Sequence, residues 1–200
     1  WVTWLAAVPL VGTLAQAVVG GITVLVDLHP MAVASHLLLS LVVVAACVAL
    51  VQFATEPVDP PGVAITRPTT RLLGNALIAV TAVIVVMGTV VTGSGPHAGD
   101  ARTARLDLDP RLISWLHADV VLLFIGLLVG MLALLHVDTS SPLARRRAWW
   151  VVAFAVLQAC IGYVQYFTGL PWVLVTVHLL GASLVWVGVW RLRLSLTQRG

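Results

Sequence analysis

The sequence predicts an all-α protein, a polytopic transmembrane helical bundle with six helices present. Hydrophobic residues make up 60% of the 200 residues and charged residues only 10%, and the mean hydropathy is +1.04. Soluble domains carry about 25% charged residues, so this composition excludes a water-soluble globule. The apolar runs are continuous and show no alternation, which excludes a transmembrane β-barrel and a disordered chain.

Six apolar stretches are each long enough to cross a hydrocarbon core of about 30 Å, which requires roughly 20 helical residues. They are residues 2–26, 31–53, 72–92, 112–136, 148–167 and 173–192. The connections 27–30 and 168–172 are tight turns, so the helices that they join form antiparallel hairpins. Both cysteines, Cys47 and Cys160, fall inside predicted helices, and the sequence therefore supports no disulfide framework or iron–sulfur cluster.

The arginines predict the orientation, because positive charge in short loops is retained on the cytoplasmic side. Eight arginines fall on one side: Arg67, Arg71, Arg145, Arg146, Arg147, Arg191, Arg193 and Arg199. Three fall on the other side: Arg102, Arg105 and Arg111. Both ends of the chain are therefore expected in the cytoplasm. The arginines are scattered over several loops, so no nucleic-acid partner is expected.

An internal repeat relates residues 14–40 to residues 156–182 without a gap. The matched pairs, all at an offset of 142 residues, include Gln16 with Gln158, Gly20 with Gly162, and His36 with His178. Gln, Gly and His are uncommon in membrane helices, so their shared spacing predicts a duplication.

The duplication predicts a pseudo-two-fold repeat of four-helix bundles in which the first copy is incomplete. Residues 1–71 would be the second half of an N-terminal bundle plus a cytoplasmic linker, and residues 72–200 a complete C-terminal bundle. Two further crossings, about 70 residues with their loops, are expected before Trp1 in the parent protein.

Three histidines lie at one depth. His36, His117 and His178 each stand five residues inside the outer end of a predicted helix. At a rise of about 1.5 Å per residue they share a layer roughly 7–8 Å below the outer boundary. Ionisable groups inside a membrane are costly and usually functional. A single histidine would more simply be explained by a hydrogen bond to a neighbouring helix, but three in one layer favour a cofactor site.

A pair of axial imidazoles facing each other across a helical bundle is how a b-type haem is held. His117 and His178 belong to the complete bundle and form the predicted pair, and Gly181 and Ala182 would leave room for the flat macrocycle. His36 stands where the first bundle's pair would be. Zinc is less favoured, because no fourth ligand shares the layer.

The remaining polar residues have simpler explanations. His29 and His97 are expected in external turns with a solvated or capping role, and His136 at a helix C-terminus, where imidazolium favours the negative end of the dipole. Gln16 and Gln158 are expected to form interhelical hydrogen bonds. Asp119 is expected to be paired or to reach the interface, with a proton-relay role as the alternative. Arg102, Arg105 and Arg111 are solvated loop charges or, alternatively, partners of haem propionates.

Several segments resemble the haem A synthases in their actinobacterial form. They are GGITVLVDLHPMAVASHLLLS (20–40), VVTGSGPHAGD (90–100), LHAD (116–119) and YFTGLPWVLVTVHLLGA (166–182), and the resemblance covers essentially all of the sequence. It implies an eight-helix bundle of the bacterial plasma membrane that oxidises the C8 methyl group of haem O to the formyl group of haem A for cytochrome oxidase. The haem sites would lie near the outer face.

The resemblance also implies roles for individual residues. His117 and His178 match the axial ligands of haem b, and His36 matches one of two histidines at the substrate haem. Many members have Arg after the first haem b histidine, where Ala118 stands here, so we expect Arg111 or a backbone donor to bind a propionate. The implied partners are haem O delivered by a haem O synthase, an electron donor or acceptor of unknown identity, membrane lipid and, as an open question, further copies of this chain.

Two alternatives to the synthase remain open. A non-enzymatic membrane electron carrier with b-type haem would have the same layer of histidines. A haemless scaffold or half of a transporter would account for the repeat alone.

Overall fold

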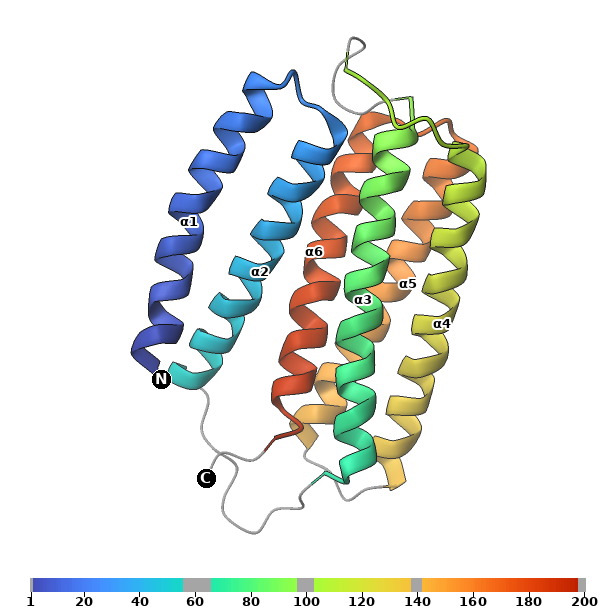
Figure 1. Cartoon of the computed structure of the whole chain (residues 1–200). Coiled ribbons are helices and arrows are strands. Elements are labelled where there is room, and N and C mark those ends of the chain that lie inside the picture. The colour runs from blue at the N-terminus through green and yellow to red at the C-terminus, as the bar shows by residue number, and fades with distance from the viewer. Residues whose placement is uncertain (1, 56–65, 97–102, 138–141, 198–200) are drawn as a thin grey trace. The chain divides into compact units, whose positions relative to one another are not determined.

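The computed structural model describes residues 2–55, 66–96, 103–137 and 142–197 and contains six α-helices within these ranges (Figure 1). The helices are α1 (Val2–Leu25), α2 (Pro30–Thr55), α3 (Pro68–Ser94), α4 (Pro110–Val137), α5 (Pro142–Phe167) and α6 (Trp172–Leu194). Each of the six is long and apolar enough to cross a membrane. The predicted all-α transmembrane bundle with six helices is therefore confirmed.

The helix ends differ from the predicted ends mainly at two N-termini. Helix α3 begins at Pro68 and α5 at Pro142, four and six residues before the predicted starts at 72 and 148. Hydropathy locates the hydrocarbon core, whereas the helical backbone continues beyond it into the polar region. Proline is favoured in the first turn of a helix, and arginine, which fills 145–147, is a good helix former.

The chain divides into two compact units, and each is described by itself. The first unit comprises Trp1–Leu50 and Ala82–Val121, and the second comprises Val51–Thr81 and Leu122–Gly200. Helices α3 and α4 therefore contribute one half to each unit. The predicted division at residue 71 concerns a two-bundle parent and stays a prediction.

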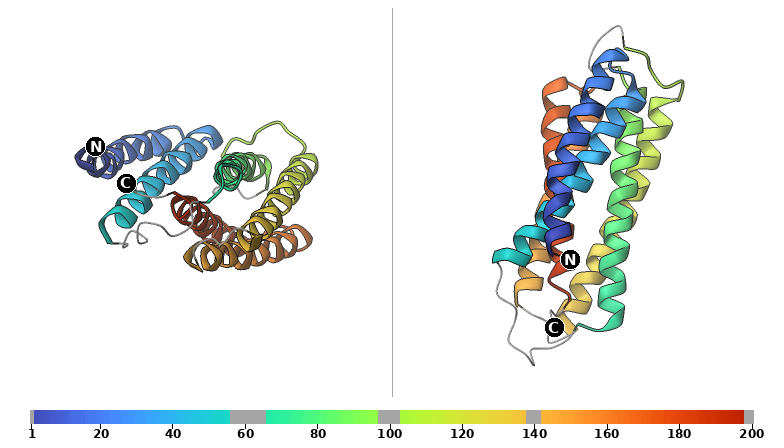
Figure 2. Two further views of the ribbon diagram at one scale, coloured as in Figure 1. Left: turned by 90° about the horizontal axis from the view of Figure 1, so that it is seen from below. Right: turned by 60° about the vertical axis from the view of Figure 1, so that its left-hand side comes forward.

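In the first unit, α1 and α2 run antiparallel beside each other (Figures 1 and 2). Their backbones approach closely at Gly12, where an added Cβ atom would lie 2.4 Å from Cγ2 of Val43. The segment before α4 folds back onto the end of α3, because the backbone N–H of Leu106 donates to the carbonyl of Gly93 at 3.0 Å. Asp109 accepts a hydrogen bond from the Arg111 N–H at 2.9 Å and so caps α4.

In the second unit, α5 and α6 form an antiparallel hairpin that packs closely. The core contains the fully buried side chains of Leu77, Met131, Leu135, Val151, Val189 and Leu192. Arg147 is also buried, and its Nη1 group donates to Oε1 of Gln52 at 3.1 Å and to the carbonyl of Arg191 at 2.8 Å. These bonds provide the polar partners that a buried guanidinium requires.

The turns of the two tight hairpins have the same backbone structure. Leu28 donates to the carbonyl of Thr23 at 2.9 Å, and Leu170 donates to that of Gln165 at 2.8 Å. Val33 bonds to His29, and Val175 bonds in the same way to Pro171, each at 3.1 Å. Every donor and acceptor pair is related by the offset of 142 residues. The backbone therefore repeats where the sequence repeats, including at positions whose residue types differ.

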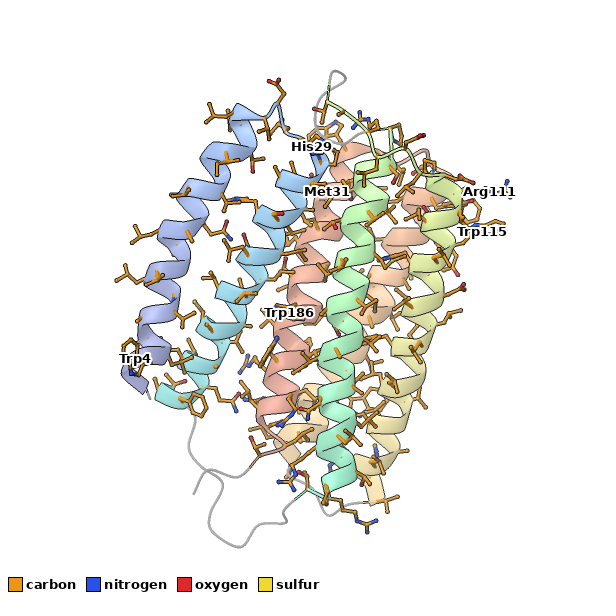
Figure 3. The ribbon with its side chains drawn as sticks, viewed as in Figure 1. Trp4, His29, Met31, Arg111, Trp115 and Trp186 are labelled. Carbon is orange, nitrogen blue, oxygen red and sulfur yellow. The ribbon has the colours of Figure 1, made fainter. Side chains whose placement is uncertain are left out.

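Tryptophans near the helix ends are largely exposed, as an interfacial aromatic belt requires. Trp4, Trp115, Trp149, Trp150 and Trp172 are exposed, and Figure 3 shows the first two near the starts of α1 and α4. Trp186 differs, because its ring is buried and lies edge-to-face with Trp190 at a centroid distance of 5.9 Å.

Candidate functional site

Each of the three histidines lies against a glycine of the preceding helix. A Cβ atom added to Gly20 would lie 3.2 Å from Cε1 of His36. The corresponding distance is 3.5 Å both from Gly88 to His117 and from Gly162 to His178. The helix pairs α1/α2, α3/α4 and α5/α6 therefore each place the Cε1 edge of an imidazole beside a glycine, and the approach is tighter than ordinary contact at Gly20.

The histidines also stand at matching places in their helices. His36 is six residues after the start of α2, His178 six residues after the start of α6, and His117 seven residues after the start of α4. The three positions agree with one another to within one residue, or about 1.5 Å along a helix, and a common depth in a membrane stays a prediction.

Two of the imidazoles have an unsatisfied nitrogen. The Nδ1 atoms of His36 and His117 are buried and have no hydrogen-bond partner among the described residues. The His117 ring also interacts with the backbone of Ile84, one turn before Gly88. Burying a polar atom without a partner costs about 1–3 kcal/mol, so these two nitrogens are candidate ligand-binding atoms.

Gln16 fixes the backbone of α2 at His36. Its Nε2 group donates to the carbonyl of His36 at 3.1 Å and to Oγ of Ser40 at 2.8 Å. Ser40 in turn donates to the same His36 carbonyl at 2.9 Å. The predicted interhelical hydrogen bond of Gln16 is confirmed, and it holds the helical turn that carries the histidine.

Gln158, the repeat partner of Gln16, packs against Gly181. A Cβ atom on Gly181 would lie 1.7 Å from Nε2 of Gln158, so the glutamine amide fills the space beside this glycine. The space beside Gly181 is thus occupied by this amide, and the expectation that Gly181 leaves room for a flat macrocycle stays a prediction. The glycine is needed because the amide of α5 lies across α6 at this point.

Arg111 and Arg105 lie in the first unit near the start of α4. The guanidinium of Arg111 is exposed and stacks over the Trp115 ring at 4.8 Å from its centroid (Figure 3). Arg105 is half-buried and donates through Nη2 to the carbonyl of Pro96 at 2.9 Å. Arg102 lies outside the described residues.

The other polar residues have local roles. Nδ1 of His29 accepts a hydrogen bond from the Met31 N–H at 3.3 Å, which confirms a capping role. Nδ1 of His136 bonds to the carbonyl of Leu132 at 2.7 Å, within its own helix. Asp119 is exposed on α4. His97 lies outside the described residues.

The structure places the predicted ligands in different units. His36 and His117 belong to the first unit and His178 to the second, so the axial pair of His117 and His178 stays a prediction. In the described part of the chain, no three His, Cys, Asp or Glu side chains come together as a bare metal ion would require. A haem iron needs only one or two axial ligands from the protein.

Sequence reasoning did not single out Gly88 as a partner of His117. The spacing hides it, because 29 residues separate this pair whereas 16 residues separate Gly20 from His36 and Gly162 from His178. The longer connection before α4 accounts for the difference.

No family model matches this sequence, and neither curated proteins nor solved structures include a match to it.

Proposed function

We propose that this chain is a haem-binding membrane protein of the haem A synthase type. The observation that supports the proposal is the repeated glycine–imidazole contact, in which His36 and His117 carry a buried nitrogen without a hydrogen bond. An imidazole held rigidly with a free nitrogen is suited to coordinate iron. The donor chemistry of His36 and His117 therefore fits a haem.

In this proposal His117 and His178 are the axial ligands of haem b. Bound haem supplies one-electron redox chemistry, and the protein contributes ligation, orientation and exclusion of water. Gly88 and Gly162 set the positions of the two rings. Arg111, exposed at the outer end of α4, is the proposed partner of a propionate, to which a guanidinium binds through charge-assisted hydrogen bonds.

His36 serves a separate site for the substrate haem. Gln16 and Ser40 hold the backbone of α2 at this histidine, so its ring is presented from a fixed turn. The substrate would be haem O and the product haem A. The proposed setting is the bacterial plasma membrane, with both ends of this chain in the cytoplasm and the haem sites near the outer face.

The visible spectrum of the purified chain tests the haem b assignment. We expect a low-spin bis-imidazole spectrum that is lost in both His117→Ala and His178→Ala. His136→Ala is the matched control, because among the described residues that ring bonds to Leu132 of its own helix, and its removal should leave the spectrum unchanged. An unchanged spectrum in both of the first two variants would overturn the assignment.

Pigment analysis separates an enzyme from an electron carrier. When the chain is produced together with a haem O synthase, a haem A synthase converts haem O to haem A, which extraction and chromatography detect. A chain that shows the low-spin spectrum but forms no haem A under these conditions would be a b-type electron carrier instead.

A further inference from the structure

The second unit is strongly positive. Its described residues include no aspartate or glutamate and seven arginines: Arg67, Arg71, Arg145, Arg146, Arg147, Arg191 and Arg193. Glu56, Asp59 and Asp138 lie outside the described residues. Loop arginines of this kind generally report orientation in the membrane, so a binding site requires more than their number.

Arg193 differs from a solvated loop arginine because its side chain is seated on α3. Its Nε–H group donates to Oδ1 of Asn75 at 2.5 Å. A Cβ atom on Gly74 would lie 2.9 Å from Cδ of Arg193, so the arginine stem crosses α3 where only glycine leaves space. The guanidinium of α6 is thus held beside α3 in a defined position.

Arg71 lies one helical turn before Asn75 on α3. Because Arg193 bonds to Asn75, its positive charge lies near that of Arg71, and both side chains are half-buried. The guanidinium of Arg71 and the Nη groups of Arg193 make no hydrogen bond among the described residues. The Arg193 guanidinium, held by Asn75 and beside Gly74, lies near a second positive charge on Arg71, and the pair is matched to a ligand that carries negative charge and several acceptor oxygens.

The start of α3 adds to the positive potential. Helix α3 begins at Pro68, so Arg71 stands in its first turn, at the positive end of the helix dipole. Oγ1 of Thr66 donates to the carbonyl of Leu196 at 2.5 Å and ties the start of α3 to the end of α6. Hydrogen bonds and close packing therefore position the Arg193 side chain and the start of α3, the helix that carries Arg71.

We propose that Arg71 and Arg193 bind the phosphate group of an anionic phospholipid headgroup. Both arginines stand at the ends of helices that are long and apolar enough to cross a membrane, which is where lipid phosphates lie. Phosphate oxygens accept several hydrogen bonds from guanidinium groups and neutralise their repulsion. Basic sites between transmembrane helices bind anionic headgroups in this manner. The site is independent of the proposed haem function.

Native mass spectrometry of the full chain in detergent, with phosphatidylglycerol added, tests this site. We expect tight binding of phosphatidylglycerol and weak binding of phosphatidylcholine. Each arginine near an anionic surface contributes a factor of about five to affinity, so Arg71→Gln with Arg193→Gln should weaken phosphatidylglycerol binding about 30-fold. Asn75→Ala keeps both charges but frees Arg193, and an intermediate loss is expected.

Arg145→Gln with Arg146→Gln is the matched control, because it removes the same charge from the same unit but leaves Gly74, Asn75 and both site arginines intact. Equal losses in the two double variants would overturn the site and leave a general charge effect.

If the first double variant does not fold, Arg71→Lys with Arg193→Lys provides the test. This variant should fold and bind phosphatidylglycerol more weakly than the unmodified chain. Undiminished binding would contradict bidentate recognition. Displacement of the lipid by inorganic phosphate at comparable concentration would identify a free-phosphate site and overturn the headgroup assignment.

Discussion

Asp27 and Gly169 occupy the same position in two equivalent turns, and both have a left-handed backbone, with φ of 53° and 75°. Each ends the first helix of its hairpin with a six-residue hydrogen-bonded turn closed by the following leucine. Glycine adopts this conformation without steric cost, whereas an L residue is strained by about 1 kcal/mol. The first hairpin therefore has the more strained turn.

Replacing Asp27 by glycine should stabilise the protein by about 0.5–1 kcal/mol, because the left-handed strain is removed. Thermal unfolding in detergent measures the effect as a higher midpoint temperature. The reverse test is Gly169→Ala, which should lower the midpoint by a similar amount. If Asp27→Gly is destabilising, the carboxylate contributes more to the turn than its backbone strain costs.

Gly20 should tolerate added volume less well than Gly88, although each lies against a histidine ring. Gly20→Ala would place a Cβ atom 3.2 Å from Cε1 of His36, so the ring must move by a few tenths of an ångström. Gly88→Ala meets His117 at 3.5 Å and should perturb its ring less. Histidine chemical shifts of labelled protein report both displacements.

Gly21→Ala is the matched control for these variants, because no atom lies within 4 Å of the added Cβ. Alanine is favoured over glycine in a helix by about 1 kcal/mol, so this variant should be neutral or slightly stabilising. Histidine signals that shift as much in Gly21→Ala as in Gly20→Ala would show that the contact with the ring is not the cause.

Gly181 and Gln158 should be strongly coupled. Gly181→Ala introduces a Cβ atom 1.7 Å from the present position of the Gln158 amide, and overpacking of this kind typically costs about 1–3 kcal/mol. Gln158→Ala removes the amide, so the double variant should recover most of the lost stability. Free energies of unfolding for the two single variants and the double variant form a double-mutant cycle, and additive effects would refute the contact.

The sequence predicted the six helices well because a helix that crosses a hydrocarbon core must be apolar along about 20 residues, and hydropathy measures this directly. It also predicted the matching positions of His36, His117 and His178 within their own helices, since position along a helix follows from residue counting alone. The hairpin turns could be aligned through Gln16, Gly20 and His36, but their shared left-handed backbone could not be foreseen, because Leu28 and Leu170 are not residues that favour it.

Contacts between side chains of different helices could not be predicted from the sequence. Which face of α6 meets α5 depends on the rotation of each helix about its axis, and hydropathy is uniform around helices this apolar. Gly181 was therefore assigned to open space although it accommodates Gln158. For the same reason the sequence did not predict the contact of Gly88 with His117 or that of Arg193 with α3, because the residues in each contact are distant in the sequence.

Replacing His36 by alanine should stop the formation of haem A while leaving the low-spin spectrum intact. The reason is that His36 and His178 are equivalent in the repeat, yet the proposed haem b site uses His117 and His178, so His36 serves a site of its own. If His36 served only for packing, its replacement would lower the free energy of unfolding by about 1–2 kcal/mol and leave the formation of haem A intact in the folded protein.

Gln16→Leu provides the structural comparison, since it removes the hydrogen bonds to the α2 backbone and to Ser40 and retains the imidazole. Haem A measured by pigment extraction should fall to background in His36→Ala and remain measurable in Gln16→Leu. A folded His36→Ala protein that accumulates haem A at the unmodified rate would refute the functional role and leave only the packing role.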